Sequence, residues 1–63
     1  MLRIGTIIDI DEALGKGIII DGNLQEIPFD LEGRFTSADL GVWVVFKIHL
    51  SDDGLTAYDI EYR

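Results

Sequence analysis

The chain contains no cysteine, one proline and one histidine. Without cysteine, it can form neither a disulfide framework nor a metal site built on thiolates. His49 alternates with Lys47 along a predicted strand, so we interpret it as a surface residue and not as a general base. The sequence also lacks the phosphate-binding G-x-x-x-x-G-K-S/T pattern. We therefore predict a protein without catalytic activity, metal or cofactor.

Basic residues are scarce. Five Lys and Arg residues stand against twelve Asp and Glu residues, which gives a formal net charge of −7. This charge favours solubility and repels phosphate backbones and anionic membranes at long range. No apolar stretch approaches the roughly 20 residues that cross a bilayer, and the first residues lack the layout of a signal peptide. We therefore expect a cytoplasmic protein with no membrane partner.

Hydrophobic residues make up 48% of the 63 residues, and ten of them are isoleucine. The length predicts one small domain, residues 1–63. A chain of this size buries only about 60% of its unfolded surface. The isoleucines occur in short β-branched runs that favour strands. Closing such strands into a barrel would remove exposed sheet edges.

The pattern predicts five strands separated by short turns. Asp21-Gly22-Asn23 and Asp53-Gly54 are typical of tight turns, because these residues tolerate positive φ. Pro28 lacks a backbone donor and indicates a strand edge or end. The expected strands span residues 2–10, 16–21, 24–29, 42–50 and 55–62, with one helical turn at 37–39. We predict an all-β fold, the five-stranded Greek-key barrel called the OB-fold.

Two glycine-containing segments resemble the first two strands of the bacterial cold-shock domain. Residues 5–10 (G-T-I-I-D-I) correspond to the family's G-T-V-K-W-F, and residues 14–19 (L-G-K-G-I-I) correspond to its K-G-F-G-F-I. Weaker matches follow in the family's order over nearly the whole chain. They fall on residues 25–29, 34–41, 41–46 and 57–60. The corresponding motifs of the family are V-F-V-H-F, G-F-K-T-L-E-E-G, G-x-x-V-x-F and A-x-N-V.

The resemblance implies binding of single-stranded RNA or DNA. The family stacks bases on aromatic side chains, and each stacked base contributes about 1–3 kcal/mol. Among the positions of this chain that correspond to the family's binding residues, only Phe29 and Phe35 are aromatic. Asp9 and Glu26 place carboxylates where a polyanion would lie. We therefore predict that binding of single-stranded nucleic acid is weak or altered. The alternative is that Phe29 and Phe35 are packing residues. The corresponding positions are Asp9, Ile10, Lys16, Ile18, Glu26, Pro28, Phe29 and Phe35.

The same positions allow a second interpretation, a protein-interaction module. Ile10, Ile18 and Phe29 would form an apolar centre, and an apolar centre with a polar rim is typical of interfaces. An ordinary sheet surface is the competing explanation. The expected rim consists of Asp9, Lys16 and Glu26.

Strand 42–50 adds a further candidate contact. If alternate residues from Val42 to Leu50 fill the barrel, Trp43 points outward. An exposed Trp43 would suit a partner or a homodimer contact, because tryptophan is favoured as an interface anchor. The alternative is that the loop around Phe35 covers it. Monomer and weak homodimer both remain open.

Overall fold

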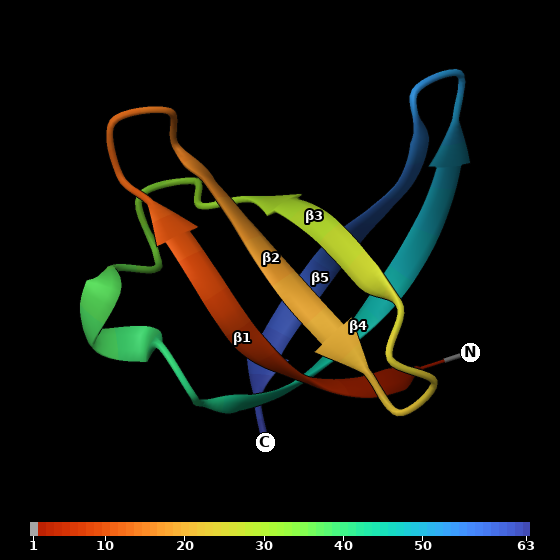
Figure 1. Cartoon of the computed structure of the whole chain (residues 1–63), viewed down its shortest axis with the longest axis horizontal. Coiled ribbons are helices and arrows are strands. Elements are labelled where there is room, and N and C mark those ends of the chain that lie inside the picture. Colours follow the sequence, from red (N-terminus) through yellow and green to blue (C-terminus); the bar gives the residue numbers. More distant parts are fainter. Residues whose placement is uncertain (1) are drawn as a thin grey trace.

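The computed structural model describes residues 2–63 and contains five strands and one short 3₁₀ helix (Figure 1). The strands begin and end within two residues of the predicted ones, and the helix occupies the predicted single turn. The all-β prediction is confirmed. The elements are β1 (Arg3–Asp11), β2 (Lys16–Asp21), β3 (Glu26–Asp30), η1 (Ser37–Asp39), β4 (Trp43–Ser51) and β5 (Gly54–Tyr62).

The strands close into a barrel in the order β1-β2-β3-β5-β4, with β4 returning to β1. Neighbouring strands are antiparallel except β3 and β5, which run parallel and share the pair Phe29 and Ala57. This is a five-stranded OB-fold-type barrel, as predicted. Within residues 2–63 the β3–β5 ladder has this single pair. Pro28 therefore lies on β3 next to a sparsely bonded edge, which tolerates its missing N–H group.

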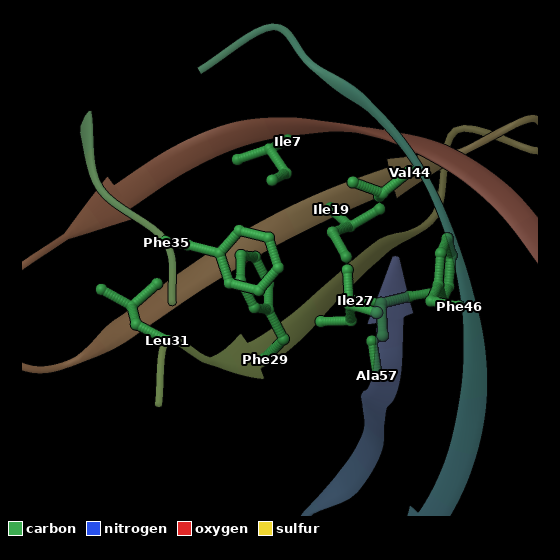
Figure 2. Packing of buried hydrophobic residues seen from close by; sticks show 10 residues of the cluster. Ile7, Ile19, Ile27, Phe29, Leu31, Phe35, Val44, Phe46 and Ala57 are labelled. Atoms are coloured by element: carbon green, nitrogen blue, oxygen red, sulfur yellow. The ribbon is translucent and has the colours of Figure 1, made fainter. Parts of the chain in front are cut away.

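The core fills the barrel with alternate residues of each strand (Figure 2). Ile7 of β1 lies opposite Ile19 of β2, which lies opposite Ile27 of β3, and all three are fully buried. Val44 and Phe46 point inward from β4, as the period-two pattern predicts. The buried cluster comprises Ile7, Ile19, Ile27, Phe29, Leu31, Phe35, Val44, Phe46, Ala57 and Ile60.

One irregularity in β1 decides which side chains reach the surface. The register between β1 and β2 shifts between Ile7 and Asp9. Beyond this bulge Asp9 lies opposite Ile18, and Ile10 lies opposite Gly17. A bulge of this kind adds one residue to one strand and reverses the alternation after it.

Candidate functional site

A groove of about 420 Å³ lies between the β1–β2 turn and the β4–β5 turn, over β2 and β3. The two turns form the upper corners of Figure 1, with β2 and β3 between them. The volume falls in the range of small-ligand sites. The lining residues are Asp9, Asp11, Leu14, Lys16, Gly17, Ile18, Pro28, Phe29, Asp30, Ser51, Asp53, Leu55 and Thr56.

Local hydrogen bonds shape the two turns that flank the groove. In the first turn the Leu14 N–H donates to the Asp11 carboxylate at 3.1 Å, and Gly15 has a φ of 70°. In the second the Ser51 hydroxyl donates to the Gly54 carbonyl at 3.1 Å, and Gly54 has a φ of 110°. Such aspartate and glycine geometry is typical of tight turns.

The walls of the groove carry an excess of negative charge. Among the lining residues of the described chain, four are aspartates and one is a lysine. The Lys16 ammonium group is paired with Asp30 across the β2–β3 ladder, so its charge is already compensated. The remaining carboxylates belong to Asp9, Asp11 and Asp53. An anion entering the groove would therefore meet uncompensated carboxylates.

The floor of the groove is aliphatic. Ile18 is half-buried and lies between Asp9 on β1 and Pro28 on β3, its two cross-strand neighbours. Leu14 of the first turn is exposed and Leu55 of the hairpin is half-buried. The site is thus a short apolar strip bordered by carboxylates.

The structure brings together four of the predicted binding residues. The groove is lined by Asp9, Lys16, Ile18 and the nearly buried Phe29. Pro28, which the cold-shock resemblance also placed in the platform, lies beside Ile18.

For the two predicted aromatic residues, the structure supports the packing interpretation over the stacking one. Phe29 is 1% exposed and Phe35 is 4% exposed, and their rings pack edge-on with centroids 5.5 Å apart. Phe29 fills the space above Gly17, where an added Cβ would lie 2.5 Å from the ring. A base cannot stack on a ring that the core already covers, so both residues are packing residues.

Two other predicted site residues lie elsewhere. Because of the β1 bulge, Ile10 turns inward and packs against the core instead of joining Ile18 on the surface. Glu26 is exposed but lies opposite Ile20 and not among the groove residues. The predicted apolar centre of Ile10, Ile18 and Phe29 therefore does not form as one exposed surface. Ile18 and Phe29 both line the groove, but Phe29 is almost fully buried, so Ile18 supplies the accessible apolar surface.

Trp43 points outward and is 56% exposed. The alternative, in which the loop around Phe35 covers it, is wrong. The Phe35 ring instead packs against Phe29 and Tyr62, at centroid distances of 5.5 and 5.7 Å.

Sequence reasoning missed the contribution of the two turns. The predicted binding residues did not include Asp11 and Leu14 of the first turn or Asp53 and Leu55 of the second hairpin, although all four line the groove. A usable signal was present, because both turns are acidic and the OB-fold places them on the same side of the barrel.

Side-chain hydrogen bonds link the first turn to η1, and η1 to the end of β5. Glu12 accepts hydrogen bonds from the Ser37 hydroxyl at 2.5 Å and the Ser37 N–H at 3.0 Å, and these bonds lower the pKa of Glu12. The Tyr62 hydroxyl donates to Asp39 at 3.0 Å, which raises the pKa of Tyr62. The turn that carries Leu14 is thereby held against η1.

Asp21 organises the opposite end of the barrel and gives a pH-dependent prediction. Its carboxylate accepts from the Gln25 and Asn23 N–H groups at 2.9 Å and pairs with Arg3 at 3.3 Å. The Gln25 bond is the largest of the effects that lower its pKa below the ordinary value of 3.8. A lowered pKa stabilises the folded state above 3.8, and the gain fades as the pH falls through the folded pKa.

We expect Asp21→Asn to lower the free energy of unfolding clearly at about pH 7 and much less at about pH 2. Urea unfolding of both proteins at the two pH values measures the difference. Asp52→Asn, which changes an exposed turn carboxylate, is the matched control. A stability loss of equal size at both pH values would contradict this role for Asp21.

Residues 2–63 contain no helix with the length and hydrophobicity that a membrane span requires. In the same part of the chain, no three histidine, cysteine, aspartate or glutamate side chains are placed to share a metal ion. His49 is exposed, and its ring packs edge-on against Tyr58 with centroids 6.5 Å apart.

No protein-family model matches the sequence, and no curated protein matches it.

Proposed function

We propose that this chain is a small non-catalytic binding module whose groove takes up an extended, cationic segment of another polypeptide. One observation carries the proposal: uncompensated aspartates from two separate turns surround an aliphatic strip. Opposite charge on a partner steers its approach and suppresses wrong partners. An apolar centre with a polar rim supplies the remaining features of an interface.

The position of the groove supports a binding role. OB-folds bind oligonucleotides and oligosaccharides over the second and third strands, between the first and the last turns. Leu14 and Asp53 come from those two turns, and Ile18 and Pro28 from those two strands. This analogy supports the place of binding, whereas the side chains must decide the ligand.

The side chains favour a cationic polypeptide over a nucleic acid. Lysine and arginine have aliphatic stems that can lie along Ile18 and Leu55 while their charged heads reach carboxylates such as Asp9. A nucleic acid would need stacking surfaces and phosphate partners. Within residues 2–63 no exposed aromatic side chain lines the groove, and Lys16 is paired with Asp30. Binding of single-stranded RNA or DNA stays a prediction, and we expect it to be weak.

The proposal is tested with a labelled peptide of about twelve alternating lysine and valine residues. About ten extended residues span some 33 Å, more than the 26 Å length of the domain, so the peptide can cross the groove. We expect Asp53→Asn to weaken binding about two- to fivefold, the value of one exposed ion pair. Fluorescence anisotropy at low salt measures the affinity.

Asp52→Asn is the matched control, because it removes the same charge from the same turn but lies outside the groove. It should change the affinity far less. Labelled oligo-thymidine of similar length serves as the competing ligand. Equal effects of the two variants, or tighter binding of oligo-thymidine than of the peptide, would overturn the proposal.

A further inference from the structure

An uncharged patch lies on the outer surface of the barrel, over β1 and its two neighbouring strands β2 and β4, away from the groove. Trp43 is its largest member, and Ile4 and Ile8 are each 43% exposed. Contiguous exposed apolar side chains that are rimmed by polar residues are typical of protein-interaction sites. This Trp43 patch consists of Ile4, Thr6 and Ile8 of β1, Ile20 of β2, and Trp43 and Val45 of β4.

The strand register makes the patch continuous. Thr6 lies opposite Ile20 on one side and opposite Trp43 on the other, and Ile4 lies opposite Val45. Directly opposed side chains on neighbouring strands are about 4.5–5.5 Å apart at Cβ, so they touch.

One row of side chains crosses neighbouring strands and carries opposite charges at its two ends. Its members are, in order, Glu26, Ile20, Thr6, Trp43 and Arg63. Glu26 lies opposite Ile20 at one end. At the other, the Arg63 N–H donates to the Trp43 carbonyl at 3.1 Å, which places Arg63 beside Trp43. Glu61, opposite Val45, is paired with Arg34 at 3.4 Å. The row therefore runs from an acid, through the uncharged residues Ile20, Thr6 and Trp43, to a base.

We propose that the Trp43 patch is the interface of a homodimer, in which two copies pack face to face about a two-fold axis parallel to β1. Such an axis through Thr6 exchanges the two ends of the row. It lays Trp43 over Ile20 of the second copy and brings Glu26 to the side of Arg63 of the second copy. An isologous contact of this kind is self-complementary.

The charges select a second copy as the occupant. A uniformly cationic or anionic partner would be attracted at one end of the row and repelled at the other. A second copy satisfies both ends twice. The uncharged centre also lets two chains of net charge −7 approach without placing like charges in contact.

Trp43 is the single tryptophan and reports directly on this interface. On raising the protein concentration, we expect the mass in sedimentation equilibrium to rise from 7.1 kDa toward twice that value. The tryptophan emission should shift to the blue over the same range. Trp43→Ala should weaken dimerisation at least about tenfold, whereas Tyr58→Ala, an exposed aromatic outside the patch, should not.

A charge exchange tests the two-fold arrangement itself. Glu26→Arg alone and Arg63→Glu alone should each weaken the dimer, because like charges then oppose each other. The double variant should recover at least part of the loss. A monomer at all concentrations up to about 1 mM, a dimer unaffected by Trp43→Ala, or no recovery in the double variant would overturn the proposal. These readouts are independent of ligand binding in the groove.

Discussion

Phe46→Ala is expected to remove about 3–5 kcal/mol from the free energy of unfolding, the largest effect of any single substitution considered. Phe46 is fully buried and belongs to β4, which closes the barrel against β1. Truncation would leave a cavity that the closed ladder cannot collapse to fill. Small domains lie at the low end of a typical stability of about 5–15 kcal/mol, so the variant should be largely unfolded.

Urea unfolding followed by circular dichroism measures this loss. Tyr58→Ala is the control, because it removes an aromatic ring that is exposed on β5. A loss below about 1 kcal/mol for Phe46→Ala would contradict the packing of the core in Figure 2.

Gly5→Ala is expected to cost about 1–3 kcal/mol or more, although it adds one methyl group. A Cβ at Gly5 would lie 2.5 Å from the Ile20 carbonyl oxygen and 2.6 Å from Cγ2 of Ile19. The oxygen belongs to the backbone of β2, so β1 and β2 would have to separate. This close approach of β1 and β2 explains why position 5 of the chain is a glycine.

Gly22→Ala is the matched control for Gly5→Ala. Within residues 2–63, no atom outside its chain neighbours lies within 4 Å of a Cβ built at Gly22. Thermal unfolding should therefore show a drop of several degrees for Gly5→Ala and little change for Gly22→Ala. Equal melting temperatures for the two variants would contradict the contact.

The sequence predicts the fold well because its strands are marked locally. Alternation in residues 42–50 identifies Val44 and Phe46 as core residues, and Asp-Gly pairs mark the turns at Gly22 and Gly54. These signals depend on neighbouring residues alone. The closure of the barrel follows from the number and length of the strands and from their apolar side chains.

The candidate site was harder to predict because it depends on two non-local features. The bulge after Ile7 turns Ile10 into the core, and no residue near it signals an added position in the strand. The groove also joins Asp11 and Asp53, which are far apart in the sequence. A resemblance between sequences assigns positions to a platform, but only packing decides that Phe29 is covered.

The central claim is that the groove binds a cationic polypeptide, and amide chemical shifts of the ¹⁵N-labelled protein test it most directly. On titration with the lysine–valine peptide, we expect the largest shift changes at Leu14, Lys16, Ile18 and Asp53. The indole N–H of Trp43, outside the groove, should stay nearly unchanged. Shift changes centred on Trp43, none at saturating peptide, or larger groove changes with oligo-thymidine than with the peptide would contradict the claim.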